Sequence, residues 1–489
     1  MCRRFDPGSA HFHKAHNAIF PTGVPRSSRP GDTEMTRLTL MRLLIGRSLT
    51  QSTPQLQPPP SQPIDRLLNP VLRFLHVEAS SGIVLLLATV VALTLANTRF
   101  AESFLAFWKI SVGVEVGEFS FRHSLRHLIN DGLMTIFFFV VGLEVKRELI
   151  VGQLREIRSA MLPLAGAAGG MVVPAALFLM VAPTSARSGW GIPMATDIAF
   201  VVGCLAVLGK RVPHGLRITL LTLAIADDVG AILVIAIGYT SAIHLSWLLL
   251  CLAGLVVMAG GILSGIRSTG FYLMVGVFTW FACHESGIHA TLSGVAIGLL
   301  TPVRPPVTDG YSARLMNQMR ALITGASPTL HEPQVKEIRE HLQSARELAS
   351  PAEYWIDVLH PWVSFVIMPI FALANAGVLF RVDAITDRLA LAVAIGLIVG
   401  KPLGILAGCA IVVKIGISQL PDGVRWIHMV GGGALSGIGF TMALFIAGLS
   451  VTGQSLDVAK VGVLGGSLIS GVIGLVILNW ARPRDVSKT

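Results

Sequence analysis

The sequence predicts an all-α polytopic membrane protein with about 12 transmembrane helices, two inverted-topology three-helix repeats with discontinuous, crossing helices, and one short β-hairpin. Apolar composition, repeated apolar runs and the interruption of two runs by Gly and Pro predict this class. Of 489 residues, 53% are hydrophobic and 13% are charged. Soluble domains carry about 25% charged residues. A soluble helical protein with a buried carboxylate pair is therefore disfavoured.

The apolar runs begin near Leu75 and have the length of membrane spans. Roughly 20 apolar helical residues cross about 30 Å of hydrocarbon. The predicted spans are 77–98, 126–146, 159–182, 191–208, 216–239, 245–265, 270–283, 287–302, 360–380, 388–413, 427–449 and 458–480.

The basic residues lie in tails and loops on alternate sides of the predicted spans. Examples are "KRELIVGQLREIR" and "GKRVPHGLR", whereas "GYTSAIHLS" on the opposite side carries no Lys or Arg. Cytoplasmic loops are enriched in Lys and Arg, so we expect both termini to be cytoplasmic. This distribution explains the net charge of +10 without a nucleic-acid partner.

The distribution of apolar and polar segments divides the chain into four regions. We expect a disordered cytoplasmic tail over 1–65, a transmembrane domain over 66–482, an enlarged cytoplasmic loop over 303–357 within it, and a short cytoplasmic tail over 483–489. The loop contains "VKEIREHLQSARELA", whose apolar residues recur at intervals of three and four and predict an amphipathic surface helix.

Cysteines and tail histidines do not indicate a metal site or a disulfide framework. The five cysteines form no Cys-x-x-Cys pair. In the polar tail, His11, His13 and His16 are better explained as solvated imidazoles than as metal ligands.

Residues 109–121, "KISVGVEVGEFSF", predict the hairpin. β-branched or aromatic residues alternate there with small or charged ones around a Gly-containing turn. An isolated hairpin is marginal in water, so we expect it to pair with a second copy in a homodimer.

Four ionisable residues fall deep in the predicted spans: Asp197, Asp227, Asp228 and Lys401. An intramembrane charge costs at least about 2.5 kcal/mol and indicates function by default. The alternative is a salt bridge between helices. For the adjacent aspartates we favour function, because one bridge needs one carboxylate. For Lys401, a functional role and a structural salt bridge both stay open.

Two spans are predicted to break within the bilayer. Gly191, Pro193 and Thr196 surround Asp197 in "GWGIPMATDIAF", and "MVGGGALSGIGFTMALF" is rich in Gly. Asp197 would neutralise the positive N-terminal ends of the half-helices and Lys401 their negative C-terminal ends. Breaks at corresponding positions of 159–239 and 388–480 indicate the inverted repeats of a secondary transporter.

The sequence closely resembles the bacterial NhaA-type sodium/proton antiporter family over most of residues 70–482. The stretches that carry the resemblance are "NDGLMTIFFFVVGLEVKREL", "GIPMATDIAF", "LAIADDVGAI", "SGIHATLSG", "LHPWVSFVIMPIFALANAG", "GKPLGI" and "GIGFTM". The family resemblance implies a location in the bacterial inner membrane and a hairpin on the periplasmic side.

The resemblance also implies roles for the four intramembrane residues. Asp228 matches the principal cation-binding and proton-carrying aspartate. Asp227 matches its neighbour, which in the family interacts with the lysine that matches Lys401. Thr196 and Asp197 match the pair where the broken helices cross.

Five further residues gain expected roles in pH sensing and ion access from the resemblance. Glu144, Arg147 and Glu148 match a cytoplasmic charged cluster associated with pH sensing. His289 matches a histidine that tunes the pH profile, and Asp131 matches an acidic residue at the periplasmic side of the second span.

The chain departs from the family pattern in three places. An acidic residue and a histidine usually precede "VLHPW", where this chain has Ile356 and Asp357. The loop that leads to this position and the N-terminal tail are also longer than usual. The first departure puts the pH at which the protein becomes active in doubt.

The residues and the resemblance together predict an electrogenic antiporter that exports Na⁺ or Li⁺ for a larger number of H⁺ and is activated by alkaline cytoplasmic pH. Burial and a like-charged neighbour disfavour an ionised carboxylate, so H⁺ and Na⁺ can compete for Asp228 and Asp227. We expect no enzymatic activity and no cofactor. A sodium-coupled symporter of an organic anion is the alternative function. An intramembrane aspartyl protease is disfavoured, because "GIGF" has Phe440 where a catalytic aspartate would stand.

Overall fold

A computed structural model provides the structure of the chain. It describes residues 78–117, 119–240, 243–266, 268–304 and 350–481. These residues belong to one compact unit, Asn69–Thr489. The two predicted tails and most of the predicted cytoplasmic loop, with its amphipathic helix, lie outside the described residues.

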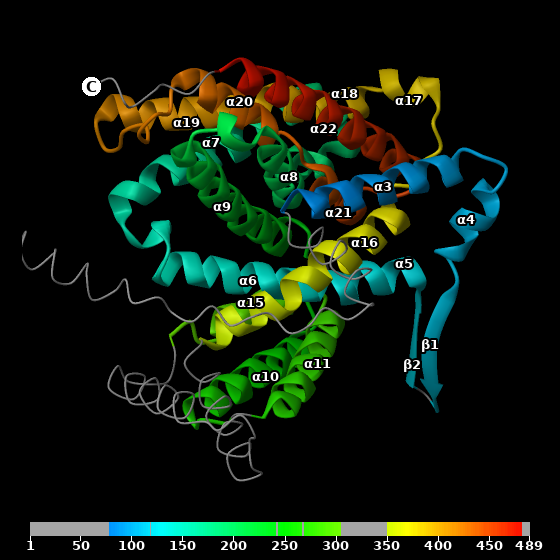
Figure 1. Ribbon diagram of the computed structural model, residues 1–489. Coiled ribbons are helices and arrows are strands. Elements are labelled where there is room, and N and C mark those ends of the chain that lie inside the picture. Colours follow the sequence, from blue (N-terminus) through cyan, green and yellow to red (C-terminus); the bar gives the residue numbers. More distant parts are fainter. Residues whose placement is uncertain (1–77, 118, 241–242, 267, 305–349, 482–489) are drawn as a thin grey trace, which may run out of the picture. The chain divides into compact units, whose positions relative to one another are not determined.

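The described elements are helical except for one hairpin (Figure 1). In chain order they are α3 (Glu78–Ala96), α4 (Ala101–Phe107), β1 (Ser111–Val116), β2 (Phe119–Ser124), α5 (Leu125–Leu128), η1 (Ile129–Leu133), α6 (Met134–Ile150), η2 (Gln153–Arg155), α7 (Ile157–Val181), η3 (Thr184–Met194), α8 (Ile198–Leu208), η4 (Gly209–Arg211), α9 (His214–Gly238), α10 (Leu245–Leu263), α11 (Thr269–Glu285), α12 (Thr291–Leu300), α15 (Pro351–Trp362), η5 (Val363–Ile367), α16 (Met368–Asn375), α17 (Val382–Thr386), α18 (Arg388–Ile395), η6 (Gly396–Gly400), α19 (Lys401–Ile415), α20 (Trp426–Ser436), α21 (Phe440–Ser450) and α22 (Gln454–Trp480).

The helices have the length and composition of a multi-pass membrane protein. Within the described residues, 7 helices are long and apolar enough to cross a membrane, or up to 9 if each of two bent pairs counts as one span. Apolar side chains also point outward: Ile237 is 83% exposed and Leu263 is 89% exposed. Lipid, rather than water, suits such surfaces. The count of twelve spans stays a prediction.

Both predicted breaks are confirmed. η3 and α8 are bent by 46° at residues 195–197, and α20 and α21 are bent by 46° at residues 437–439. The two breaks touch, because the backbone N–H of Asp197 donates a hydrogen bond to the carbonyl of Ile438 at 2.7 Å. Backbone groups freed from a helix inside a bilayer need such partners.

Helices α7 and α19 pack with their backbones in close contact. A Cβ added at Gly404 would collide with the carbonyl of Gly169, and one at Gly408 would collide with the carbonyl of Ala165. Small residues four positions apart, such as Gly404 and Gly408, allow membrane helices to approach closely. The packing holds Lys401, the first residue of α19, against the interior of the unit, where it is 0% exposed.

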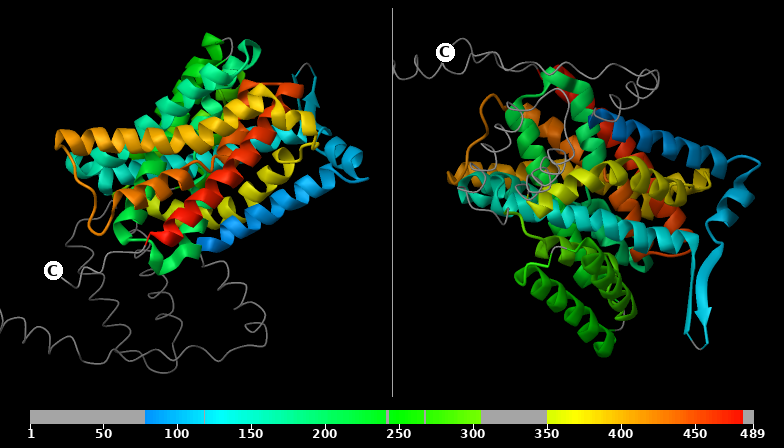
Figure 2. Two further views of the ribbon diagram at one scale, coloured as in Figure 1. Left: turned by 90° about the horizontal axis from the view of Figure 1, so that it is seen from above. Right: turned by 60° about the horizontal axis from the view of Figure 1, so that its bottom comes forward.

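The predicted hairpin over 109–121 is confirmed, and its strands begin at Ser111 and end at Ser124. β1 and β2 pair antiparallel from Ser111 opposite Ser124 to Val116 opposite Phe119. Gly117 in the turn has a φ of 59°, which glycine adopts without strain. Figure 2 shows the hairpin extending away from the helices, and β2 leads directly into the start of α5.

One helix begins before its predicted span. The helix that contains most of the span expected over 360–380 is Pro351–Asn375, so it begins within residues that sequence analysis assigned to the loop of 303–357. Ser350 caps this helix by accepting a hydrogen bond from the N–H of Glu353 at 3.1 Å. The polar first turn concealed the start, although Ser-Pro followed by an acidic residue is a known helix-start signal.

Candidate functional site

The adjacent aspartates lie in the middle of α9. Asp227 is 13 residues after the helix start at His214 and 11 residues before its end at Gly238, which at about 1.5 Å per residue is close to half its length. Asp227 is 1% exposed and Asp228 is 3% exposed. Neighbouring helical residues project about 100° apart, so the two carboxylates meet different surroundings.

Asp227 is held by Thr196 and Lys401. Its Oδ2 atom accepts a hydrogen bond from the Thr196 hydroxyl at 2.6 Å and forms an ion pair with the Lys401 ammonium. The other carboxylate oxygen, Oδ1, is buried and has no hydrogen-bond partner among the described residues. One face of this carboxylate is thus fixed while the other retains unused acceptor capacity.

Lys401 also binds the end of a broken helix. Its ammonium donates a hydrogen bond to the carbonyl of Met194, the last residue of η3. Carbonyls at the C-terminal end of a helix have no intrahelical partner and carry partial negative charge. Lys401 follows directly after the π-helical turn η6, and such turns occur frequently at functional sites.

Asp197 lies at the N-terminal ends of two half-helices. Its Oδ1 accepts from the N–H of Phe200 in α8 at 3.1 Å, and its Oδ2 accepts from the N–H of Thr441 in α21 at 3.1 Å and from the Thr441 hydroxyl. The carboxylate therefore satisfies donors of both α8 and α21 and neutralises their positive ends.

The Thr196 hydroxyl connects the first break to the second. Its oxygen lies 2.6 Å from Asp227 Oδ2 and 2.9 Å from the carbonyl oxygen of Ser436, the last residue of α20. A hydroxyl has one hydrogen to donate. When Asp227 is ionised the hydroxyl can donate to it, and when Asp227 is protonated the hydroxyl can accept from it and donate to Ser436.

Asp228 has a different environment from its neighbour. It makes no hydrogen bond or ion pair with any residue in the described part of the chain, although it is buried. Asp227, Glu144 and Asp197 contribute negative potential at its carboxylate, and Lys401 contributes positive potential. A buried carboxylate without a fixed partner can accept a mobile cation or a proton.

The structure separates the five residues expected in pH sensing and ion access into two groups. Glu144, Arg147 and Glu148 lie toward the C-terminal end of α6, where Glu148 accepts a hydrogen bond from the N–H of Gln153 at 2.6 Å. Glu144 is the member of this group whose charge acts on Asp228. Asp131 lies 17 residues before Glu148, about 25 Å away along the helix axis.

The second group consists of Asp131 and His289. Asp131 lies in the π-helical turn η1, and the charge of His289 acts on it. His289 also contacts the second broken span, because its ring centroid is 5.5 Å from that of Phe445 in α21. This group lies near His127 and His284, which the sequence did not single out.

Two further buried polar residues, Thr441 and Lys460, were not singled out by sequence analysis. Thr441 holds Asp197, and the only sequence signal was its place beside "GIGF". Lys460 in α22 is 1% exposed and lies within the electrostatic range of Arg126 and Asp457. Lys460 lies near the start of the predicted span 458–480, where polar residues are common, so its position alone did not indicate a function.

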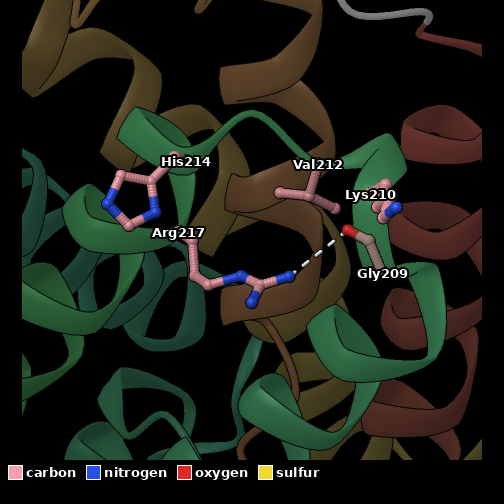
Figure 3. A pocket seen from close by; sticks show the side chains of 5 residues that line it. All are labelled: Gly209, Lys210, Val212, His214 and Arg217. Atoms are coloured by element: carbon pink, nitrogen blue, oxygen red, sulfur yellow. Dashed lines mark hydrogen bonds between the residues drawn. The ribbon is translucent and has the colours of Figure 1, made fainter. Parts of the chain in front are cut away.

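A separate pocket of about 350 Å³ lies between α8 and α9 and is lined by Gly209, Lys210, Val212, His214 and Arg217 (Figure 3). Arg217 donates a hydrogen bond to the carbonyl of Gly209 at 3.3 Å. The two permanent positive charges of its lining repel cations, so this pocket is not the cation site.

Comparison with known proteins agrees with the geometry. The family model of Na⁺/H⁺ antiporter 1 matches residues 72–478. The chain belongs to this family. It is 53% identical over 436 residues to the Na(+)/H(+) antiporter NhaA of Rhodopirellula baltica, covering 88% of this chain and 98% of the relative.

Further relatives cover similar shares. The Na(+)/H(+) antiporter NhaA 2 of Acidiphilium cryptum is 46% identical, over 89% of this chain and 97% of the relative. The Na(+)/H(+) antiporter NhaA of Rhizobium meliloti is 45% identical, over 86% and 96%. Family membership confirms the resemblance carried by the sequence motifs, and the antiporter family is one of transport proteins.

Proposed function

We propose that the chain is a secondary antiporter of the bacterial inner membrane, with both termini in the cytoplasm, that exports Na⁺ or Li⁺ in exchange for a larger number of H⁺. The observation that carries the proposal is the buried Asp228, which has no hydrogen bond or ion pair within the described residues and lies beside the fixed Asp227. Relatives named Na(+)/H(+) antiporters support it.

Asp228 binds the transported cation and the proton in turn. Na⁺ is a hard cation that prefers oxygen ligands such as carboxylates, by the logic that holds for other hard ions. The Oδ1 of Asp227, which has no hydrogen-bond partner among the described residues, and the hydroxyl of Thr196 offer further oxygens of this kind. Because a carboxylate that binds Na⁺ has lost its proton, binding of one ion releases the other.

The crossed breaks allow alternating access. Repeats over 159–239 and 388–480 place one broken span at the centre of each, and both breaks lie beside the aspartates. Movement of one repeat against the other would expose Asp228 first to one side of the membrane and then to the other. Asp197 and Lys401 keep the half-helix ends neutralised during this movement.

Excess proton charge makes the cycle electrogenic. A second proton would come from Asp227, whose protonated form would release Lys401. Each net charge moved gains about 2.3 kcal/mol per 100 mV of membrane potential. This energy would drive Na⁺ export against its gradient.

Alkaline cytoplasmic pH would activate the exchange. Raising the pH removes the proton that competes with Na⁺ at Asp228. Glu144, Arg147 and Glu148 at one end of α6 would pass the cytoplasmic pH to the site, since the charge of Glu144 acts on Asp228. Asp131 and His289 at the other end would admit and release ions on the periplasmic side.

The hairpin would join two copies of the chain. Both edges of the two-stranded sheet lack a strand partner among the described residues. Open edges pair readily with another strand. We therefore assign homodimer formation to the hairpin predicted over 109–121.

The test measures Na⁺-induced loss of a proton gradient across vesicles that contain the purified protein. The wild type should dissipate the gradient with Na⁺ alone, while Asp228→Asn should not. Asp422→Asn, the same change at an exposed carboxylate in the loop before α20, is the matched control and should behave as the wild type. Exchange at the wild-type rate by Asp228→Asn would refute the proposal. A requirement for an added organic anion would favour a symporter instead.

A further inference from the structure

Three histidines from separate parts of the chain meet beside Asp131. His123 lies on β2, His127 on α5 and His284 near the end of α11. One ring nitrogen of each lies within 4.8 Å of those of the other two. The His123 and His127 rings are stacked with centroids 4.5 Å apart, and the His123 and His284 rings are 5.1 Å apart. These three residues form the histidine cluster.

A carboxylate lies against the cluster. Asp131 Oδ2 is 3.4 Å from His127 Nε2 and 3.5 Å from His284 Nδ1. Asp131 itself is 8% exposed. A negative charge at this distance favours a cation bound at the cluster.

The surrounding residues restrict the movement of the cluster. Trp280 stacks on the ring of His284 at 6.0 Å and donates a hydrogen bond to the backbone carbonyl of Asp131 at 3.3 Å. The Nε2 atom of His127 is buried without a hydrogen-bond partner in the described part of the chain. A buried polar atom in this state is costly, and a ligand at the cluster would relieve that cost.

The chemistry of the cluster differs from that of the aspartate site. Imidazole nitrogens favour zinc and other transition metals, whereas carboxylate and carbonyl oxygens favour hard cations. Na⁺ would therefore not compete for this position.

We propose that the histidine cluster is a binding site for one Zn²⁺ ion, with His123, His127 and His284 as ligands and Asp131 as the compensating charge. Three protein ligands with a remaining open position are a common arrangement for zinc. The bound ion would connect the base of the hairpin to α5 and to α11. This site is separate from the transport site at Asp228.

The first experiment measures Zn²⁺ binding to the purified full-length chain without a polyhistidine tag, in competition with a chromophoric chelator. The wild type should bind one Zn²⁺ per chain at the cluster. His123→Ala/His127→Ala/His284→Ala should lose this binding, and Asp131→Asn should weaken it roughly 10–100-fold. His11→Ala/His13→Ala/His16→Ala removes three histidines from the N-terminal tail as a matched control and should retain it.

A second measurement keeps the cluster intact in case its triple variant does not fold. X-ray absorption at the zinc edge of the Zn²⁺-loaded tail variant should show imidazole nitrogens as the main ligands. Zinc bound only by oxygen atoms would overturn the proposal. So would unchanged Zn²⁺ affinity in a folded cluster variant, or loss of the Zn²⁺ in the tail variant.

Discussion

At the scale of single residues, the two neighbouring aspartates differ in what surrounds them rather than in burial. Asp227 has Thr196 and Lys401 as fixed partners, and Asp228 has none among the described residues. The sequence predicted that adjacent helical positions must face different partners, and it named Lys401 as the partner of Asp227 by family resemblance.

The Asp227–Lys401 pair leads to a prediction about stability. Asp227→Asn leaves a buried ammonium without its counter-ion, and removal of one partner of a buried pair costs about 3–5 kcal/mol. The double variant Asp227→Asn/Lys401→Gln removes both charges and should recover much of the loss. Thermal unfolding in detergent measures both variants. Equal destabilisation of the single and double variants would show that the pair does not hold these helices.

Which histidines gather was only partly predictable from the sequence. His123 and His127 stand in the spacing His-x3-His, which is common in zinc sites and which sequence analysis did not single out, whereas His284 lies 157 positions after His127. Sequence analysis considered His11, His13 and His16 because they are close in sequence. Only tertiary packing brings His123, His127 and His284 together.

At the scale of helices, the breaks were predictable and the π-helical turns were not. Gly and Pro mark places where helices break inside a membrane, and both marked stretches are bent. By contrast, η1 contains Gly132 and η6 contains Gly396 and Gly400, but sequence analysis did not distinguish these glycines from those of an unbroken helix. These turns place Asp131 and Lys401, so their local geometry depends on packing.

At the second break, one added methyl group should clearly destabilise the protein. A Cβ at Gly437 would collide with the carbonyl of Leu397 and the hydroxyl of Ser470. Gly437→Ala should therefore destabilise the protein by about 1–3 kcal/mol, the usual cost of overpacking.

Gly448→Ala in the same span is the control. Nothing lies within 4 Å of a Cβ at Gly448, so this change should be neutral or slightly stabilising. Midpoints of thermal unfolding compare the two variants. A Gly437→Ala protein as stable as Gly448→Ala would contradict the close crossing at this break.

Ile356 shows how a departure from the family is accommodated by packing. It is 6% exposed and belongs to an apolar cluster with Leu143, Val303 and Ala352. Leu143 directly precedes Glu144 on α6. An apolar side chain that packs in the same cluster as Leu143 therefore stands where the family resemblance implies an acidic residue, whereas Asp357 is exposed.

At the scale of the whole molecule, α6 links the two groups of titratable residues. Glu144, Arg147 and Glu148 lie at one end of it and Asp131 with its histidines at the other. Sequence analysis assigned Glu144, Arg147, Glu148 and Asp131 to one class, pH sensing and ion access. The structure places them at opposite ends of the helix formed by η1 and α6, and the cytoplasmic and periplasmic sides that the family resemblance implied for them stay a prediction.

The homodimer proposal predicts that the hairpins of two copies meet. Val112 on β1 is 48% exposed, so Val112→Cys should form a cross-link between copies in the membrane. Val172→Cys on α7 is 66% exposed and provides the control, which should remain uncross-linked. Gel mobility after mild oxidation measures both. Equal cross-linking of the two variants would indicate random collision rather than pairing through the hairpin.

The central claim is that Na⁺ and H⁺ occupy the same buried carboxylate in turn. The most direct test adds Na⁺ to the purified, weakly buffered protein and records the protons that it releases. The wild type should release protons as Na⁺ binds, and Asp228→Asn should release none at this site. Binding of Na⁺ by the wild type without any proton release would contradict the account.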